Sequence, residues 1–416
     1  MRVIVLGAGV IGTTTAYFLT RDGHEVTVID RQEGPGLETS FANGGFISKL
    51  TAQPWAHPKV PKMLLKNLFR DDAPYLFRLR PDLAQWIWAI RFLSNCNYKT
   101  FRHGRDRSIS LAKYSSSQLE IVRSKEKIEY DRLTHGLIEL YPTDQALISA
   151  YELAKQLPDN KDHPEILDMR ASIDIEPALS SQRGNYAGTL FYRGEETGDA
   201  YKFTVNLSKS STLLGTKFRY GEIVTNILME GPRASGVVTN KGTYKADAVV
   251  ICLGSFSSKL LNKIGIKVPI FPLKGYSTTL DIDNHNYAPT HGIHDITKRI
   301  VLSRLGNRLR CAGTAELTGF DSSINKNRAN SILEDSVRLF PGLGNSKNAK
   351  LWTGLRPMTP DCLPIIGKSS VNGLYLNSGH GSLGWTWCCG SGRIISDIIK
   401  GNKPDIDISG FIPERF

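Results

Sequence analysis

The feature that most constrains the fold is a glycine pattern at the start of the chain. Gly7, Gly9 and Gly12 follow the apolar run Arg2–Leu6 and open a helical pattern near residues 10–22. In a strand-turn-helix unit the first glycine permits a tight turn, the second lets the backbone approach a pyrophosphate, and the third lets helix and strand pack closely. The free N–H groups at the start of the helix then face the phosphates. The spacing predicts a dinucleotide-binding Rossmann half-domain.

An acidic residue supports this interpretation. Asp30 ends the next apolar run, which begins at Glu25, and lies about 20 residues beyond the glycines, where a carboxylate holds ribose hydroxyls. A turn that merely needs glycine is the alternative. Strand, helix and acid in register favour nucleotide binding, although they do not choose between NAD and FAD.

A second glycine-rich segment, Gly379–Thr386, precedes Gly390 and Gly392 and a final helix expected near residues 390–400. A helix N-terminus stabilises negative charge, and a reduced flavin carries such charge around N1 and the C2 carbonyl. The segment therefore favours FAD. Glycines that serve only a loop are the alternative.

The rest of the chain predicts further units. Residues 50–165 are helix-rich with proline-containing joints, and three β-branched runs between residues 218 and 251 predict a meander that returns to a central strand. Residues 268–315 are typical of strands, and residues 322–340 of a helix. At 416 residues the chain is long enough for two or three compact units.

Charge is unevenly spread. The chain carries +12, and residues 59–107 contain eleven Lys or Arg against four Asp, a local charge of +7. Apolar runs such as Leu64–Leu65, Leu68–Phe69, Tyr75–Phe77 and Leu83–Leu93 interrupt the basic side chains, as on an interfacial surface. The stretch predicts attachment to an anionic membrane surface, with a solvated face of core helices as the alternative. Its aromatics form no base-stacking platform, so no nucleic-acid partner is expected.

The sequence also argues against a membrane-spanning, a secreted and a metal-binding protein. No apolar run is long enough to span a membrane, and Met1 is followed at once by a strand-like run, so neither a transmembrane helix nor a signal peptide is expected. Six cysteines without paired spacing indicate reduced thiols in the cytoplasm. The nine histidines form no ligand pattern, and no metal is expected.

Segments along nearly the whole chain carry a specific resemblance. They are Glu38–Gly45, Pro54–Ala56, Ala73–Pro74, Phe77–Pro81, Ile128–Asp131, Gly198–Ala200, Pro272–Tyr276, Trp352–Pro357 and Gly379–Arg393. With them the sequence resembles the FAD-dependent D-amino acid dehydrogenases, within the D-amino acid oxidase and glycine oxidase superfamily. Phe46, Lys49–Leu50 and Cys362 depart from the pattern of that family.

The resemblance implies an α/β fold: a Rossmann-type FAD-binding domain, with a parallel sheet and a β-meander, and a discontinuous α+β substrate domain. The expected FAD-binding domain comprises residues 1–50, 191–265 and 350–416, and the substrate-binding domain residues 51–190 and 266–349.

The glycine pattern and the resemblance together imply a set of cofactor-binding residues along the first strand, turn and helix, around the second glycine-rich segment, and beside the flavin or the adenosine. They are Val3, Ile4, Val5, Leu6, Gly7, Ala8, Gly9, Val10, Ile11, Gly12, Thr13, Thr14, Thr15, Ala16, Tyr17, Asp30, Arg31, Ser40, Asn43, Gly44, Gly45, Val224, Gly254, Gly379, His380, Gly381, Gly384, Trp385 and Thr386.

The resemblance also implies two catalytic residues, Arg356 and Tyr276. The arginine of the matching Gly-Leu-Arg-Pro segment holds the substrate carboxylate, a task that suits a guanidinium because its fork donates two parallel hydrogen bonds. A structural ion pair is the alternative for Arg356. Tyr276 resembles a position beside the active site, although tyrosine is also common in strands.

The implied activity is oxidative deamination of a D-amino acid to a 2-oxo acid and ammonia, by hydride transfer from the substrate Cα to flavin N5. Electrons would pass to a quinone-type or other acceptor, from an enzyme in the cytoplasm and peripheral on the inner face of the membrane. Two alternatives remain open: a flavin oxidase of glycine, sarcosine or proline, and a non-catalytic FAD-binding subunit.

Overall fold

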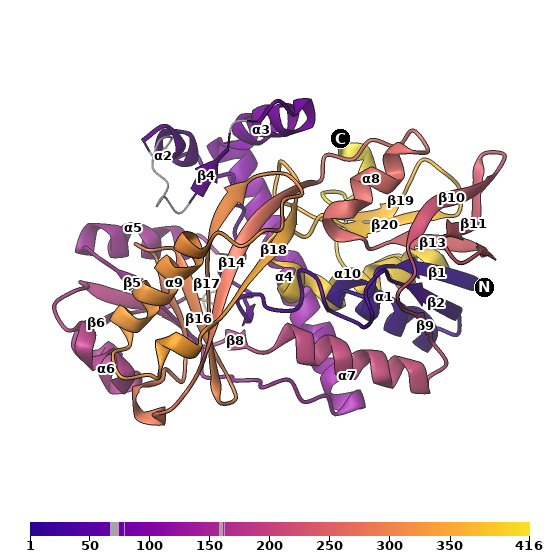
Figure 1. Ribbon diagram of the computed structural model, residues 1–416. Helices are drawn as coiled ribbons and strands as arrows, with labels where there is room; N and C mark the ends of the chain where they lie inside the picture. Colours follow the sequence, from indigo (N-terminus) through magenta and orange to yellow (C-terminus); the bar gives the residue numbers. More distant parts are fainter. Residues whose placement is uncertain (67–74, 79, 158–160, 162) are drawn as a thin grey trace.

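Two sheets and their helices organise the molecule, and the long strand β14 runs through its centre in Figure 1. The computed structural model describes residues 1–66, 75–78, 80–157, 161 and 163–416. The segment Ala73–Pro74, the run Leu68–Phe69 and the basic Arg70, which the sequence analysis singled out, lie outside the described residues.

The first sheet has six strands in the order β19-β20-β13-β1-β2-β9, all parallel except β19. Its strands are β1 (Arg2–Leu6), β2 (Glu25–Ile29), β9 (Lys217–Arg219), β13 (Ala248–Ile251), β19 (Ile365–Lys368) and β20 (Leu374–Ser378). Along β1, Val3 and Val5 enter one apolar cluster, and Ile4 and Leu6 enter another on the opposite face. Because both faces are covered, the strand is apolar throughout. The predicted α/β class with a parallel sheet is confirmed.

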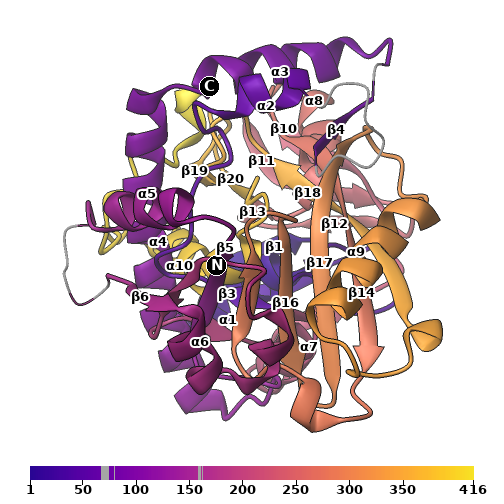
Figure 2. The same ribbon diagram turned by 90° about the vertical axis from the view of Figure 1, so that its left-hand side faces the viewer.

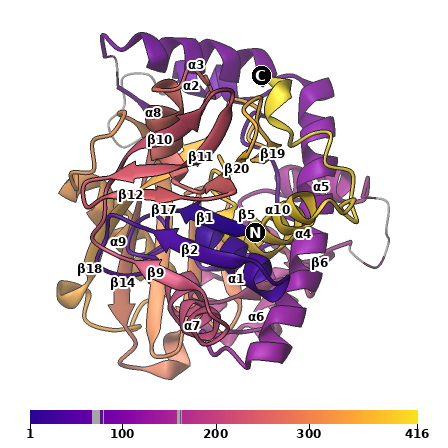
Figure 3. The same cartoon turned by 90° about the vertical axis from the view of Figure 1, so that its right-hand side faces the viewer.

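Helices cover one face of this sheet (Figure 3). They are α1 (Val10–Arg21), α4 (Tyr98–Glu126), α7 (Ala200–Leu213) and α10 (Gly384–Lys400), and α1 packs against both α7 and α10.

The predicted start of the last helix was wrong. Gly390 and Gly392 lie inside α10 and not in a turn before it. A Cβ on Gly390 would lie 2.9 Å from the Cα of Ser115, and one on Gly392 would lie 3.0 Å from the backbone of Thr14. Both glycines therefore allow α10 to pack closely against neighbouring helices.

The other face carries the predicted meander. It consists of β10 (Val224–Glu230), β11 (Arg233–Thr239) and β12 (Thr243–Lys245), all antiparallel, and the helix α8 (Ser257–Asn262) follows the central strand β13. The return to a central strand is confirmed, and β12 is a strand that the sequence pattern missed.

The second sheet is larger and mixed, in the order β18-β14-β17-β16-β15-β5-β7-β6, with β4 beside β17. Its strands are β4 (Tyr75–Phe77), β5 (Leu137–Tyr141), β6 (Glu165–Asp168), β7 (Gly188–Tyr192), β14 (Phe271–Asp281), β15 (Gly292–Asp295), β16 (Ile300–Leu305), β17 (Arg308–Leu317) and β18 (Lys350–Met358). The helix α9 (Lys326–Leu339), whose position was predicted, packs on β14 and β17, and Figure 2 shows it in front of these strands.

The remaining elements join the two sheets or lie at the rim. They are β3 (Phe46–Ile47), β8 (Glu196–Thr197), α2 (Val60–Lys66), α3 (Leu83–Asn95), α5 (Asp144–Ala154), α6 (Met169–Ile175) and the short 3₁₀ helices at Pro177–Gln182, Gly254–Phe256, His285–Tyr287, Ser346–Asn348 and Pro413–Arg415. The helix-rich stretch 50–165 thus also supplies β4 and β5 to the large sheet. The division into two discontinuous domains stays a prediction.

Candidate functional site

A cavity of about 1210 Å³ lies between the two sheets. One wall comes from the carboxyl ends of the parallel strands, where Gly7 follows β1, Asp30 follows β2 and Gly254 follows β13. The opposite wall comes from the large sheet, through Tyr276, Thr314 and Arg356. Ligand pockets usually measure about 300–1,000 Å³, so this cavity has room for a dinucleotide cofactor together with a small substrate. The carboxyl edge of an open parallel sheet is also where such cofactors bind.

We call the wall around Gly7, Gly9, Asp30, Arg31 and Gly254 the dinucleotide end. A Cβ on Gly7 would lie 2.6 Å from the carbonyl oxygen of Cys252, and one on Gly12 would overlap the carbonyl oxygen of Gly7, so protein packing excludes side chains there. At Gly9 the nearest atom to an added Cβ is the Ser40 hydroxyl oxygen, 3.5 Å away. Gly9 is therefore open on the cavity side, as the backbone must be to receive a pyrophosphate.

The charged groups at the dinucleotide end have partners within the protein. The Asp30 carboxylate accepts hydrogen bonds from the backbone N–H of Ala8 at 2.6 Å and of Gln32 at 2.8 Å, while burial raises its pKa. Arg31 donates from Nε to Glu38 at 2.8 Å, and its guanidinium carbon lies 3.9 Å from the ring centre of Phe256. These contacts shape the loop around the cofactor.

Two helices begin at the cavity. Helix α1 starts after Gly9 and α10 starts after Leu383, and both residues line the cavity. At the start of α1 the Val10 N–H donates to the Ser40 hydroxyl at 3.1 Å, while no described side chain caps the other N–H groups of its first turn or the start of α10. Uncapped N–H groups favour negative charge, so the cavity offers two anion-binding ends to one ligand. A pyrophosphate and a reduced flavin ring supply these two charges, so the residues present fit FAD.

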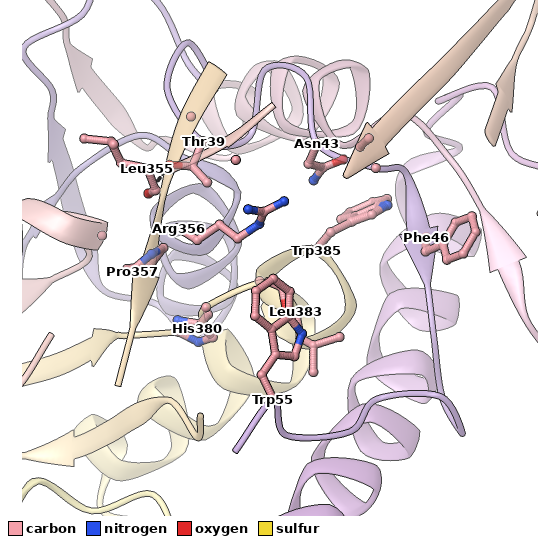
Figure 4. A pocket seen from close by; sticks show the side chains of 18 of the residues that line it. Thr39, Asn43, Phe46, Trp55, Leu355, Arg356, Pro357, His380, Leu383 and Trp385 are labelled. Carbon is pink, nitrogen blue, oxygen red and sulfur yellow. Dashed lines mark hydrogen bonds between the residues drawn. The ribbon is translucent and has the colours of Figure 1, made fainter. Parts of the chain in front are cut away.

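Trp385 is the second residue of α10 and His380 precedes the helix, and both side chains line the cavity (Figure 4). Both side chains are buried, and the His380 Nε2 and Trp385 Nε1 atoms have no hydrogen-bond partner among the described residues. Burial lowers the pKa of His380 to about 3, so the imidazole is neutral at physiological pH. It adds no charge to the site.

Arg356 projects from β18 toward the middle of the cavity, as Figure 4 shows. Its Nη1 donates to the Thr314 carbonyl oxygen at 3.1 Å, and its guanidinium carbon lies 5.5 Å from the ring centre of Trp55. Within the described part of the chain, no carboxylate lies within ion-pair distance of this guanidinium. Burial lowers the pKa of Arg356 to about 10, still well above neutral pH, so the side chain keeps its charge. We call the wall around Arg356, Trp55, Tyr75 and Thr314 the arginine end.

A glycine fixes the position of this guanidinium. Gly275 lies two residues along β14 from Leu273, which pairs with Arg356 across the sheet. A Cβ on Gly275 would overlap the guanidinium group, which therefore lies directly against the backbone of β14. Any larger residue at position 275 must displace it.

Backbone strain accompanies the arginine end. The register between β14 and β17 shifts between Lys274 and Tyr276, which leaves one extra residue in β17. At this bulge Thr314 has a φ of 55°, an unfavourable value for a β-branched residue. The bulge brings the carbonyl of Thr314 to Arg356.

Tyr276, the second predicted catalytic residue, lines the cavity, but its hydroxyl is already engaged. It donates to Glu316 at 2.6 Å, and burial together with that carboxylate raises its pKa. Glu316 lies 3.6 Å from the buried Lys274. A catalytic role for Tyr276 stays a prediction.

The predicted cofactor-binding residues fall into two groups. The following line the cavity: Gly7, Gly9, Val10, Ile11, Asp30, Arg31, Ser40, Asn43, Gly44, Gly45, Val224, Gly254, His380, Gly381, Gly384 and Trp385. The following lie behind its wall: Val3, Ile4, Val5, Leu6, Ala8, Gly12, Thr13, Thr14, Thr15, Ala16, Tyr17, Gly379 and Thr386. Several of the second group hold the fold together, as where Tyr17 donates to Glu126 and Thr14 to the Cys388 carbonyl.

The sequence analysis gave no individual role to several lining residues, among them Trp55, Tyr75, Gly275, Arg299 and Thr314. Only Trp55, Tyr75 and Gly275 stood inside segments that had been singled out. Arg299 and Thr314 sit in a turn and at a bulge, and no local pattern distinguishes them.

The sequence matches a family model described as FAD dependent oxidoreductase over residues 2–398. The chain is 42% identical to a D-amino acid dehydrogenase of Allorhizobium ampelinum and 43% identical to one of Rhizobium rhizogenes. Each match covers 100% of this chain and 99% or 100% of the relative.

Solved structures show the same fold. A glycine oxidase from Bacillus cereus superposes with a TM-score of 0.74 at 21% identity, covering 97% of this chain and 96% of that chain. An L-proline dehydrogenase from P. horikoshii superposes with a TM-score of 0.76 at 18% identity, covering 100% and 97%. At these identities the likeness concerns the fold alone.

Proposed function

The chain belongs to the FAD dependent oxidoreductase family, and from that premise we propose that it is a D-amino acid dehydrogenase. Its cofactor is FAD, and it is a flavin-dependent oxidoreductase. The proposed reaction converts a D-amino acid and water into a 2-oxo acid and ammonia, with two electrons passed to an acceptor. The name of the two full-length relatives supports the choice of substrate.

The observation that carries the proposal is Arg356. A guanidinium that has no carboxylate partner among the described residues, and that Thr314 and Gly275 hold in place, is suited to an anion from outside the protein. An amino acid offers a carboxylate, which the guanidinium fork can bind through two parallel hydrogen bonds. A non-catalytic FAD-binding subunit has no need of such a group beside its cofactor.

The chain's own residues bind and orient the substrate. Arg356 holds the carboxylate, and the walls of the cavity fix the direction in which the Cα hydrogen points. FAD supplies the acceptor for that hydrogen and its electron pair. No protein acid or base is required, since the neutral amine provides its lone pair as the hydride leaves and water then hydrolyses the imine.

A substrate screen tests this proposal. The purified protein is given D- and L-amino acids, glycine, sarcosine and proline, each with an artificial dye as electron acceptor. We expect turnover with D-amino acids, with equal amounts of 2-oxo acid and ammonia formed. Turnover confined to glycine, sarcosine or proline would support a flavin oxidase instead, and no turnover with any compound would favour the non-catalytic subunit.

We also propose that the enzyme binds peripherally to an anionic membrane, where it would reach a quinone-type electron acceptor. Helix α3 supports this with a row of exposed apolar side chains; its members are Leu83, Trp86, Ile87, Ile90 and Leu93. Its opposite side packs inward through Trp88, whose Nε1 donates to the Met358 carbonyl at 2.9 Å. Figure 1 places α2 and α3 at the rim of the molecule. Within the described residues, no helix is both long and apolar enough to cross a membrane.

The basic stretch is only partly available for that contact. Lys62 and Lys66 on α2 and Arg91 on α3 are exposed, whereas Arg105 is buried and bonded to Asp106. Each basic side chain near an anionic leaflet contributes about 1 kcal/mol, so these three are enough for reversible attachment.

Vesicle sedimentation tests the attachment. The enzyme should bind anionic vesicles at low salt and leave them at high salt. Ile87→Gln with Ile90→Gln should weaken the binding, whereas Leu213→Gln, at an exposed leucine on α7, should not. Replacing Lys62, Lys66 and Arg70 by Gln should act in the same direction. A wild-type enzyme that ignores anionic vesicles at low salt would refute the attachment.

A further inference from the structure

A second arginine stands in the wall of the arginine end. Arg299 lies in the turn between β15 and β16, with a φ of 56°, and lines the same cavity as Arg356. Its Nη1 donates to the Tyr75 hydroxyl at 3.1 Å, and its Nη2 lies 3.5 Å from the sulfur of Met63. Tyr75 and Met63 also line the cavity, so these contacts hold the guanidinium at the cavity wall.

Two aromatic rings link the two arginines. The guanidinium carbon of Arg299 lies 5.1 Å from the ring centre of Tyr75, whose ring centre lies 5.5 Å from that of Trp55. The guanidinium carbon of Arg356 lies 5.5 Å from the same Trp55 ring. Arg299 and Arg356 therefore flank one aromatic pair, each through a cation–π contact.

Neither arginine is neutralised by the residues that the structure describes. Most other arginines with described partners have carboxylates beside them, as where Arg308 lies 2.8 Å from Asp199. Arg299 has no such neighbour in the described ranges, and neither does Lys59, which lines the cavity nearby.

The charges facing this wall are mostly positive. Burial lowers the pKa of His57, and the charges of Lys59 and Arg299 lower it further. The carboxylate of Glu139 lines the cavity too, but it accepts hydrogen bonds from Tyr141 at 2.8 Å and lies 3.0 Å from the His294 Nδ1. The Arg299 side of the cavity thus presents cationic groups to a bound substrate, with a potential that favours a second anion.

We propose that Arg299 is a specificity residue that binds a side-chain carboxylate, so that the preferred substrates are acidic D-amino acids, D-aspartate or D-glutamate. This inference rests on the proposed function and narrows it. Arg356 holds the α-carboxylate, and the substrate side chain points along Trp55 and Tyr75 to Arg299. A cationic side chain such as that of D-lysine is repelled there.

Steady-state kinetics of the purified holoenzyme, with an artificial electron acceptor, test the proposal. D-Glutamate and D-glutamine are compared because they have nearly the same size and differ in charge, and D-aspartate and D-alanine are measured beside them. In the wild type kcat/KM should be at least about 10-fold higher for D-glutamate than for D-glutamine, the value of one charge-assisted contact. Arg299→Gln should bring that ratio close to one while changing kcat/KM for D-alanine less than about 2-fold.

Two further variants separate specificity from structure. Lys298→Gln removes the neighbouring exposed cation, which pairs with Asp335 at 3.0 Å, and should leave the ratio unchanged. Arg299→Lys keeps a cation and should keep part of the preference. The FAD content of each variant shows that it has folded.

The outcomes are distinct. A wild type that turns over D-glutamine as well as D-glutamate overturns the inference, although D-alanine oxidation would still support the proposed function. An Arg299→Gln variant that loses D-alanine and D-glutamate activity equally shows that Arg299 only holds the segment near Tyr75. A wild type that oxidises none of these D-amino acids overturns this inference, and the proposed function is overturned with it when the wider substrate screen also finds no D-amino acid that is oxidised.

Discussion

The two ends of the cavity differ in whether their charged side chains have partners within the protein. At the dinucleotide end Asp30 accepts two backbone hydrogen bonds and Arg31 is paired with Glu38. At the arginine end Arg356 and Arg299 have no carboxylate partner among the described residues. A charge that is paired or hydrogen-bonded within the protein is offered less strongly to a ligand, whereas the buried Arg356, which has no carboxylate partner among the described residues, leaves part of its stabilisation to a ligand. We therefore expect the dinucleotide end to bind its ligand mainly through backbone N–H groups and the shape of the cavity, and the arginine end mainly through charge.

The difference has an energetic consequence. A cation held in a low-dielectric site without a partner costs folding free energy, which is reflected in the lowered pKa of Arg356. The strained φ of 55° at Thr314 adds to this cost. In the proposed function an anionic substrate would offset the cost of the unpaired cation when it binds, so we expect this gain in binding free energy at the arginine end and not at the dinucleotide end.

The largest expected effect is that of Arg356→Gln. Loss of the charged fork should lower kcat/KM about 100-fold or more, since a bidentate contact to a carboxylate is worth about 3 kcal/mol. FAD should stay bound, because the guanidinium is assigned to the substrate. Kinetics with D-amino acids and the flavin absorbance of the purified variant measure the two quantities. An unchanged kcat/KM with FAD present would remove Arg356 from the substrate site.

Gly275→Ala should have the next largest effect, about 30-fold in kcat/KM. The new methyl group would overlap the guanidinium of Arg356 and displace it, and a displacement of about 1 Å can cost 100-fold.

A double variant sharpens this prediction. If Gly275 acts only through the arginine, then Gly275→Ala combined with Arg356→Gln should be no worse than Arg356→Gln alone. Additive losses would instead mean that Gly275 supports the strand β14 independently of Arg356.

Asp30→Asn tests the dinucleotide end. The carboxylate accepts from Ala8 and Gln32, so losing its charge should weaken FAD binding about 10-fold by disturbing the loop and the expected ribose contact. With FAD in excess, kcat/KM should recover to the wild-type value. Titration of the apoprotein with FAD gives the affinity, and a persistent kinetic defect at saturating FAD would show that the two ends are not independent.

The two ends also differed in how far the sequence could predict them. The turn at Gly7–Gly12 and the acid at Asp30 form within one strand-helix-strand unit, so a local pattern was enough to predict where they lie in the fold, and their contacts with FAD stay a prediction. The arginine end is assembled from β14, β17 and β18, which pair across long sequence distances. Arg356 could be predicted only through a resemblance.

The sequence analysis misplaced one helix start and did not single out Arg299, and both outcomes have physical causes. The start of the last helix was misplaced because glycines that allow close helix packing, as at Gly390 and Gly392, look like turn glycines in the sequence. Arg299 could not be singled out because its proposed role depends on Tyr75, more than 200 positions away, and on the absence of a carboxylate neighbour in the part of the chain that the structure describes. Neither contact leaves a local pattern.

The smallest expected effect, that of Arg31→Gln, decides whether the comparison holds. Arg31 lines the cavity as Arg356 does and carries the same charge, but it is paired with Glu38, and the two side chains are 43% and 36% exposed. Exposed ion pairs contribute only about 0–1 kcal/mol, so Arg31→Gln should weaken FAD binding by no more than about 5-fold and leave kcat/KM unchanged at saturating FAD. The measurement is the same FAD titration and the same D-amino acid kinetics used for Asp30→Asn and Arg356→Gln. If Arg31→Gln instead costs as much as Arg356→Gln, then pairing within the protein does not separate structural from ligand-binding arginines in this cavity.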